Sequence, residues 1–250
     1  MLECIDWPLA TPDRTSPTTM KPFQLPSNST RKSARAFTLI ELLVVIVIIA
    51  VLAAMMLPVL GRAKEAGYRT KCLSNLRQVG VAMLSYAVEN SNQYPDNSGG
   101  SWPWDVNRAL IDSLVKNYGA TRDIFYCPAQ PKQNSEKTWN FTSGYRVTGY
   151  AWLLHNSPQV PAQYQQKSSL GDETKSAPET ELILDAVLSE NGVYSNVKGG
   201  NAINRSNHMD LAGKFPTGAN ILFKDGHVQW RDFEVMKKKP HTFGNPQFQF

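Results

Sequence analysis

The chain has 250 residues, of which 42% are hydrophobic and 19% charged, and its formal net charge is +5 at pH 7. The first 60 residues comprise a polar stretch and an apolar run, neither of which can form a domain. Fewer than 200 residues remain after them, which is enough for one modest domain and too few for a large enzyme. Residues 37–250 carry 21 basic and 18 acidic side chains once the five basic and three acidic residues of the first 36 are set aside. That balance is too even to predict a nucleic-acid partner.

The first 36 residues are rich in Pro, Ser and Thr and have neither helical nor strand periodicity. We interpret residues 1–36 as a leader peptide without a fold of its own. We interpret Met20 as the true start of the chain. A leader that begins there still holds four basic side chains: Lys21, Arg31, Lys32 and Arg35.

Residues 37–57 form an apolar run of 21 residues in which Glu41 is the only charge. Roughly 20 apolar residues suffice for a helix to cross a bilayer, so we predict a transmembrane helix over residues 37–60. A bare carboxylate in hydrocarbon costs several kcal/mol unless it finds a partner, and the nearest candidate is a free amine at Phe37. Glu41 therefore indicates a function beyond simple anchoring.

Helical periodicity continues beyond this span. Apolar residues recur at spacings of three and four over residues 61–91, and charged residues fill much of the opposite side. We predict one helix from Phe37 to about Asn90, roughly 80 Å long at 1.5 Å per residue, a length suited to a filament core. Pro58 is expected to kink this helix or to open a turn. The predicted apolar face comprises Leu73, Leu76, Val79, Gly80, Met83, Tyr86 and Ala87.

The stretch Arg35-Ala36-Phe37-Thr38-Leu39-Ile40-Glu41, between a basic leader and a long apolar helix, resembles the class III signal of type IV pilins and type II secretion pseudopilins. The resemblance implies that a prepilin peptidase cuts between Ala36 and Phe37 and methylates the new terminus. It also implies that Glu41, the fifth mature residue, pairs with the terminal amine of a neighbouring subunit during assembly. Ala36 stands where the family usually has Gly, so we expect slower processing.

Two other interpretations of this N-terminus stay open. An ordinary secretory signal would use the same basic residues and a small-residue cleavage site within residues 50–54. An uncleaved single-span anchor would also have its basic end held in the cytoplasm.

The head is predicted to begin at residue 92, in a run rich in Asn, Ser and Gly that is typical of a turn. A second helix is predicted over residues 102–118, with an apolar face formed by Trp104, Leu110, Leu114 and Val115. Strands are predicted over four later stretches, with an Asp-Gly turn joining the last two: residues 145–154, 181–188, 219–223 and 227–230.

The end of the chain resembles a large bacterial subgroup of pilin-like proteins that carry a His followed at a distance by Asp-Gly. Here sixteen residues separate His208 from Asp225, an interval longer than is usual in that subgroup. The match therefore includes an insertion over residues 209–216.

Cys72 and Cys127 are the only cysteines that remain after the predicted processing. In an oxidising compartment they are predicted to form a disulfide that stabilises the head by roughly 2–4 kcal/mol. Two independently buried thiols are the competing interpretation. A two-cysteine metal site is not expected, since no further ligands occur at suitable spacing.

Four side chains of the C-terminal part are of types that bind divalent metals: Asp185, His208, Asp225 and His227. Calcium is the candidate ion, because some similar pseudopilins bind it. We prefer the plainer interpretation, in which these residues serve in turns, strands and loop hydrogen bonds, and we predict neither a metal nor a cofactor. The sequence has no Gly-rich phosphate loop, no Gly-x-Ser-x-Gly and no paired metal helix, so no enzymatic activity is predicted.

These observations predict an α+β, pilin-like fold in which a long N-terminal helix packs on a small antiparallel β-sheet head over residues 92–250. The predicted function is a structural subunit of a type IV pilus-like or type II secretion pseudopilus filament. Its precursor would cross the inner membrane once, with the head in the periplasm. The resemblance implies as partners copies of the chain and related pilins, the prepilin peptidase and an inner-membrane assembly platform. It leaves open whether the subunit is major or minor, and whether the filament serves secretion, motility, adhesion or DNA uptake.

The alternative function is a membrane-anchored or surface-displayed module that binds a sugar or a protein. Aromatic side chains could stack on such a ligand: Trp102, Trp104, Trp139, Tyr145, Tyr150 and Trp152. Exposure of Trp102 and Trp139 would support this alternative, and burial of both would favour a purely structural head.

Overall fold

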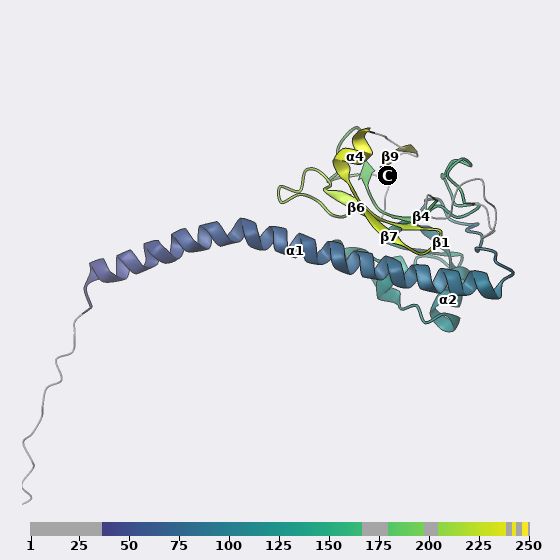
Figure 1. Ribbon diagram of the computed structural model, residues 1–250, viewed down its shortest axis with the longest axis horizontal. Coiled ribbons are helices and arrows are strands. Elements are labelled where there is room, and N and C mark those ends of the chain that lie inside the picture. Colours follow the sequence, from purple (N-terminus) through teal and green to yellow (C-terminus); the bar gives the residue numbers. More distant parts are fainter. Residues whose placement is uncertain (1–36, 167–179, 198–204, 239–241, 244–246, 250) are drawn as a thin grey trace, which may run out of the picture. The chain divides into compact units, whose positions relative to one another are not determined.

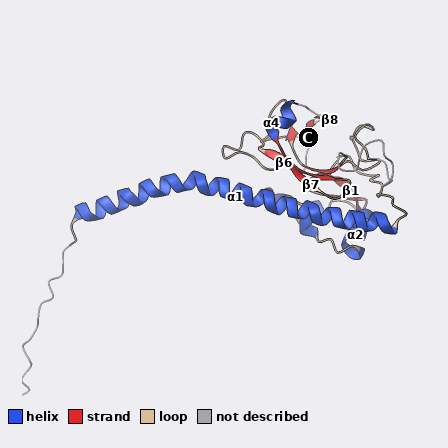
Figure 2. Ribbon diagram, in the orientation of Figure 1, coloured by secondary structure: helices blue, strands red, loops and turns tan. Residues whose placement is uncertain are grey.

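The computed structural model describes residues 37–166, 180–197, 205–238, 242–243 and 247–249 (Figure 1). The chain divides into two units, Met1–Val47 and Ile48–Phe250, and helix α1 (Leu39–Glu89) begins in the first and continues into the second. Shorter helices and antiparallel strands follow α1 along the chain (Figure 2). This architecture confirms the predicted α+β, pilin-like class.

Helix α1 is 51 residues long, and its bounds lie within two residues of the predicted ones. Every side chain over residues 37–60 is exposed. The helix continues without a break through Pro58, so no turn opens there, contrary to one of the two outcomes expected of this proline.

The second half of α1 is amphipathic, as predicted. Five of the seven residues predicted for its apolar face are buried, and Leu73 and Tyr86 are half-buried. Gly80 lets α1 lie close to the Leu222 side chain, because a Cβ at this position would be only 2.8 Å from Leu222 Cδ1. The face packs into the main hydrophobic core with residues of the later elements, among them Leu110, Ile111, Leu114, Tyr150, Trp152 and Ile183.

The described strands form three antiparallel sheets. The largest has the order β3-β4-β6-β7, with β3 Tyr150–Trp152, β4 Glu181–Asp185, β6 Gly218–Phe223 and β7 Val228–Asp232. A second sheet pairs β1 (Asp105–Asn107) with β2 (Tyr145–Val147). The third has the order β5-β9-β8, with β5 Leu188–Ser189, β9 Gln247–Gln249 and β8 Thr242–Phe243. The remaining helical segments are α2 (Arg108–Asn117), η1 (Arg122–Phe125), η2 (Pro131–Gln133), α3 (Glu136–Trp139) and α4 (Phe233–Lys238).

The predicted Asp-Gly hairpin is confirmed. Strands β6 and β7 pair in antiparallel register from Gly218 with Asp232 to Leu222 with Val228. Gly226 in the turn has a φ of 89°, a conformation that side chains with a Cβ rarely adopt. The turn residue was therefore readable from the sequence.

Helix α2 begins six residues later than predicted. The preceding residues pair as β1 with β2, and Asn107 caps the helix because its side-chain oxygen accepts a hydrogen bond from the Ala109 N–H at 2.9 Å. Trp104 is buried but precedes α2, and Val115 is 36% exposed. These two residues therefore do not belong to the buried face, which Ile111 completes.

Two of the predicted strands are each divided in the structure. Residues 145–154 yield β2 and β3, which join different sheets because Gly149 between them donates its N–H to the Phe125 carbonyl at 2.9 Å. Residues 181–188 yield β4 and the start of β5, and the Ala186 carbonyl between them accepts the Asn207 N–H at 2.9 Å. Both breaks arise from contacts with distant segments.

The aromatic side chains proposed for ligand stacking serve mainly in packing. Trp104, Tyr150 and Trp152 are buried, whereas Trp102 and Trp139 are half-buried, so neither expected outcome for the latter pair holds in full. Trp102 stacks on Trp104 with ring centroids 5.2 Å apart and an interplanar angle of 7°. Among the described residues, these rings do not form an exposed platform for a ligand.

Candidate functional site

The N-terminus of α1 is organised by Thr38 and Glu41. The Glu41 carboxylate accepts hydrogen bonds from the Thr38 N–H at 2.8 Å and from the Thr38 hydroxyl at 2.9 Å. In return the Thr38 Oγ1 accepts the Glu41 N–H at 3.2 Å. This reciprocal arrangement is a capping box, which the spacing Thr-x-x-Glu could have revealed and which sequence analysis missed. Glu41 therefore has a local structural role as well as a charge.

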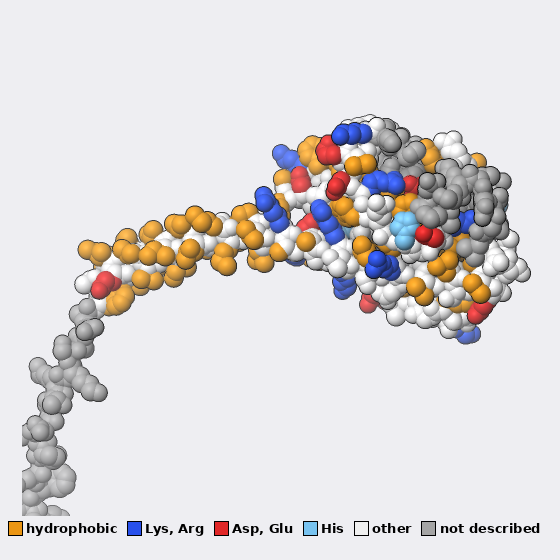
Figure 3. Space-filling view, viewed as in Figure 1, with side chains coloured by type: hydrophobic (Ala, Val, Ile, Leu, Met, Phe, Trp, Pro, Cys, Tyr) orange, Lys and Arg blue, Asp and Glu red, His pale blue; other side chains and the backbone are white. Residues whose placement is uncertain are grey.

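The segment over residues 37–60 presents an uninterrupted apolar surface. Figure 3 shows hydrophobic side chains along this part of α1. Its most apolar 18-residue window has a mean hydropathy of 3.2 and none of it is buried, and the helix is long enough to cross a membrane. An exposed apolar surface of this extent marks a site for lipid or for other protein chains. Phe37 is 70% exposed just before α1, and Ala36 lies outside the described residues.

A second site lies inside the head, where four buried polar side chains converge: Cys72, Cys127, Asp185 and His208. Asp185 Oδ2 lies 3.0 Å from Cys72 Sγ, 3.8 Å from Cys127 Sγ and 2.9 Å from His208 Nε2. Cys127 Sγ also lies 3.4 Å from His208 Nε2. We call this group the four-residue cluster; its potential ligand atoms all lie within 4.8 Å of one another.

Each member of the cluster is placed by a different element. Cys72 belongs to the buried face of α1, and Cys127 follows the η1 segment. Asp185 is the last residue of β4, opposite Tyr150 of β3. His208 lies in the loop before β6, and its carbonyl accepts hydrogen bonds from both the N–H and the hydroxyl of Thr217 at 2.8 Å, which closes the intervening loop.

A further set of side chains holds the cluster from outside. The His208 Nδ1 lies 2.8 Å from the Glu65 carboxylate on α1. The Asp185 Oδ1 accepts the Ala186 N–H at 3.0 Å and is also bonded by the Asn207 side-chain amide. Because the outer atoms of His208 and Asp185 are thus engaged, His208 Nε2 and Asp185 Oδ2 face the two sulfur atoms.

The electrostatics of the cluster are dominated by contact between Asp185 and His208. Burial opposes charge on both groups, yet their mutual attraction and hydrogen bond hold the pKa of Asp185 below its usual range and raise the pKa of His208 to about 12. Burial, aided by the nearby Cys72 and Asp185, raises the pKa of the Cys127 thiol well above its ordinary value. Their contact thus favours the ionised form of each group over its neutral form.

The structure does not contain the disulfide predicted between Cys72 and Cys127. Both residues are buried free thiols. Cys72 Sγ is directed to the Asp185 carboxylate, and Cys127 Sγ contacts both that carboxylate and the His208 ring. The competing interpretation of independent thiols is also incomplete, because the two sulfur atoms share these partners. Asp185 and His208 place two further potential donor atoms beside the two sulfur atoms.

The predicted metal-ligand candidates separate into two places. Asp185 and His208 meet in the cluster, whereas Asp225 and His227 contact each other at the β6–β7 turn, with 2.6 Å between Asp225 Oδ1 and His227 Nδ1. His227 also stacks on Phe223 with ring centroids 4.2 Å apart. Asp225 therefore has the turn role of the plainer interpretation, whereas His227 lies just before β7 and not on the strand expected for it.

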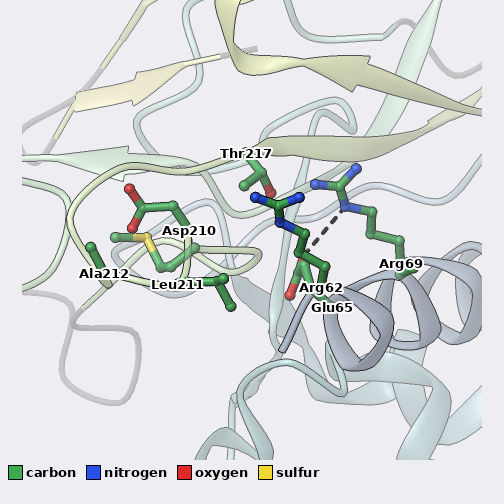
Figure 4. A pocket seen from close by; sticks show the side chains of 9 residues that line it. Arg62, Glu65, Arg69, Asp210, Leu211, Ala212 and Thr217 are labelled. Carbon is green, nitrogen blue, oxygen red and sulfur yellow. Dashed lines mark hydrogen bonds and ion pairs between the residues drawn. The ribbon is translucent and has the colours of Figure 1, made fainter. Parts of the chain in front are cut away.

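A surface pocket of about 510 Å³ lies beside the cluster (Figure 4). Figure 4 shows three side chains of α1, Arg62, Glu65 and Arg69, facing a loop that carries Asp210 and Leu211. Arg69 Nε lies 3.4 Å from Glu65 Oε1, the carboxylate that also contacts His208. The pocket therefore reaches the outer side of the cluster through Glu65.

Comparison with known proteins identifies the N-terminal segment first. The prokaryotic N-terminal methylation motif matches residues 31–57, which include the predicted processing residues Ala36 and Phe37 and the predicted assembly residue Glu41. The chain is 32% identical over 118 residues to the type IV wide pilus major component PilA4 of Thermus thermophilus, covering 43% of this chain and 89% of that protein. The chain belongs to the type IV pilin and type II secretion pseudopilin family. The resemblance seen in the sequence is thereby confirmed.

Other relatives of this pilin-family chain are type II secretion proteins. It is 35% identical over 97 residues to the type II secretion system core protein G of Pectobacterium carotovorum, which covers 39% of this chain and 61% of that protein. It is also 35% identical over 100 residues to core protein G of Escherichia coli, covering 40% of this chain and 68% of the relative. The chain thus spans less than two thirds of the Pectobacterium protein. No solved structure matches the chain.

Proposed function

We propose that this chain is a structural subunit of a type IV pilus-like or type II secretion pseudopilus filament. The carrying observation is an exposed apolar segment, residues 37–60, on a helix whose other half is packed into the head. The relatives named as core protein G and as a wide pilus major component support this role. These are names of pilins and pseudopilins, and we propose no catalytic role for the head.

The exposed apolar segment would be buried twice in succession, first in the membrane and then among neighbouring subunits. In the precursor, residues 37–60 cross the inner membrane once, with the head in the periplasm. In the filament, the same surface packs against copies of the chain or related pilins. A prepilin peptidase would cut between Ala36 and Phe37, and an inner-membrane platform would drive assembly. Both steps use one exposed segment, which explains why the head leaves it bare.

Glu41 is proposed to carry the assembly contact through its charge. Cleavage before Phe37 creates an amine four residues from Glu41, and a neighbouring subunit would present the same amine. A carboxylate and an ammonium that pair in hydrocarbon offset the cost of burying either alone, which is several kcal/mol. The capping box provides a rival account, in which Glu41 only starts the helix.

The first experiment determines the N-terminus. Intact mass and N-terminal sequencing are measured on membrane-fraction protein expressed with and without a prepilin peptidase. We expect a methylated Phe37 terminus only with the peptidase. A terminus within residues 50–54 would identify a secretory signal, and an uncleaved leader would identify a plain anchor. Either result would overturn the filament proposal.

The second experiment separates the charge of Glu41 from its capping role. Glu41→Gln keeps a side chain that can complete a capping box but removes the charge, whereas Thr38→Val removes the capping hydroxyl and keeps the charge. Because each 1.4 kcal/mol is a factor of ten, loss of an ion pair in lipid should lower the filament yield by roughly tenfold or more. We expect this loss in Glu41→Gln alone, with cleavage unchanged in both variants. Normal filament yield from Glu41→Gln would reduce Glu41 to a helix cap.

A further inference from the structure

We propose that Cys72, Cys127, Asp185 and His208 form a structural zinc site that fixes α1 to the head. The inference is independent of the filament role, because it concerns the interior of the head and needs no partner. It also replaces the calcium candidate suggested by the sequence, since the structure assembles a different set of donor atoms.

The spacing of the donors fits one small cation. In a tetrahedral site with bonds of about 2.3 Å to sulfur and about 2.1 Å to nitrogen or oxygen, neighbouring donors are about 3.4–3.8 Å apart. The distances from Asp185 Oδ2 to the other three donors are 2.9, 3.0 and 3.8 Å, and Cys127 Sγ lies 3.4 Å from His208 Nε2. Seating an ion would require Asp185 Oδ2 to move about 0.5 Å farther from His208 Nε2 and about 0.6 Å farther from Cys72 Sγ, which side-chain rotation can supply, and the other donor pairs lie within 4.8 Å.

The chemistry of the donors selects the ion. Two thiolates, one imidazole nitrogen and one carboxylate oxygen form a soft, four-donor set of the kind that zinc prefers. Calcium requires six to eight oxygen ligands, and the cluster offers one carboxylate. All four residues are buried, which matches the closed coordination of structural rather than catalytic zinc sites.

The outer contacts are those that orient metal ligands. A histidine that binds zinc almost always donates its other ring N–H to a carboxylate or carbonyl, and Glu65 lies 2.8 Å from His208 Nδ1. The Asn207 amide and the Ala186 N–H engage Asp185 Oδ1, so the Oδ2 atom is left for a single bond to the ion. The hydroxyl of Tyr150 lies 3.6 Å from Cys72 Sγ, where it can donate to a thiolate.

A buried Asp–His ion pair beside two thiols is the competing account of the same geometry. That account explains the contact of Asp185 with His208, and both thiols can donate to Asp185 Oδ2, so the two accounts differ in whether the head binds an ion. A divalent cation neutralises two thiolates and the carboxylate to within one charge. It thereby offsets the repulsion that two thiolates and a carboxylate would otherwise exert on one another in the interior.

A bound ion would connect α1 to three other segments of the head. Cys72 ties α1 to the η1 region, to the end of β4 and to the loop before β6, through one ion. The pocket beside Glu65 brings solvent to the outer side of the cluster, next to His208. Binding in the folded head but not in the unfolded chain would add directly to the stability of the helix–head attachment.

The test uses the full chain with Cys4→Ser, so that Cys72 and Cys127 are the only thiols. The protein is expressed in zinc-supplemented medium, extracted in a mild detergent and purified without chelator, and zinc per chain is measured by mass spectrometry of the metal. We expect one zinc per chain. Cys127→Ser and His208→Gln should reduce zinc at least tenfold, whereas the matched surface variant His227→Gln should retain it.

Buried variants can fail to fold, so a second measurement uses the parent chain alone. After the metal is removed with a chelator under reducing conditions, Co²⁺ should produce the absorption of a tetrahedral site with thiolate ligands, and one equivalent of Zn²⁺ should abolish it. A parent chain that takes up neither ion in stoichiometric amount overturns the proposal. So does a Cys72–Cys127 disulfide in the protein from zinc-supplemented cells, or a folded His208→Gln that keeps its zinc.

Discussion

The two halves of α1 share one helix but differ in how their side chains are covered. Every side chain over residues 37–60 is exposed, and Glu41 is the only charge there. Over residues 61–89 charged residues recur, and one face is buried in the head. The head thus buries apolar side chains of the second half of α1 but none of the first half. The first half requires a covering from outside the described chain, either lipid or other subunits.

The largest expected effect comes from testing this difference with one substitution in each half. Leu76→Ala removes a side chain that is fully buried in the core, so it should lower the free energy of unfolding of the head by about 2–5 kcal/mol. Leu43→Ala removes the same atoms from a side chain that is 51% exposed, and it should change that free energy by less than about 0.5 kcal/mol.

The measurement is urea unfolding of both full-length variants in detergent, followed by tryptophan fluorescence, which reports on the head because all six tryptophans except Trp7 lie there. Similar losses from Leu76→Ala and Leu43→Ala would contradict the division of α1. Filament yield supplies the reverse comparison, since Leu43→Ala should impair assembly without loosening the head.

A second prediction concerns Asp105, a buried acid of the head, which makes the stability of the head depend on pH. Burial raises the pKa of Asp105 to about 6, although its carboxylate accepts hydrogen bonds from the N–H groups of Ser101 and Trp102. A carboxyl whose folded pKa lies above its unfolded value stabilises the fold fully below the unfolded value of 3.8, and that stability is lost as the pH rises through about 6. Asp105 therefore weakens the head at neutral pH.

Asp105→Asn should remove this pH dependence, because Asn can still accept through its side-chain oxygen and carries no charge. Relative to the parent, we expect the variant to gain at most about 3 kcal/mol between pH 4 and pH 8, from 1.36 kcal/mol per pKa unit. The check is the difference in unfolding free energy between parent and variant at the two pH values. A difference that does not change with pH would show that Asp105 keeps an ordinary pKa.

The sequence was informative where a local period or turn determines the structure. The spacing of Leu76, Val79 and Met83 predicted the buried face of α1, and Asp225-Gly226 predicted the final hairpin. The strand breaks at Gly149 and Ala186 were not predictable in this way, because they depend on hydrogen bonds to segments far away in the chain.

The four-residue cluster could not be predicted from the sequence for the same reason. Cys72 and Cys127 in an exported chain indicated a disulfide, because spacing and compartment were the only available signals. Their neighbours Asp185 and His208 come from a strand end and a loop, and only packing brings these four together. His208 had been noticed through its place before Asp225, but its structural partners are elsewhere. Long-range packing, rather than a motif, defines this site.

The smallest expected changes in stability come from replacing either of two glycines of α1 with alanine. Gly80→Ala would place a Cβ 2.8 Å from Leu222 Cδ1 in the core, so Leu222 must shift, and we expect a loss of about 1–3 kcal/mol from overpacking. Gly67→Ala meets no atom within 4 Å and should instead stabilise the helix by about 0.5–1 kcal/mol, because alanine restricts the unfolded chain and favours the helix.

The opposite signs make this pair a direct probe of which side of α1 the head covers. Thermal unfolding of both variants in the same detergent provides the comparison, with the parent chain as reference. The intrinsic preference of alanine over glycine for a helix is the same at both positions, so any difference between the variants reports contact with β6. Equal stabilisation by the two substitutions would mean that Gly80 is not pressed against Leu222.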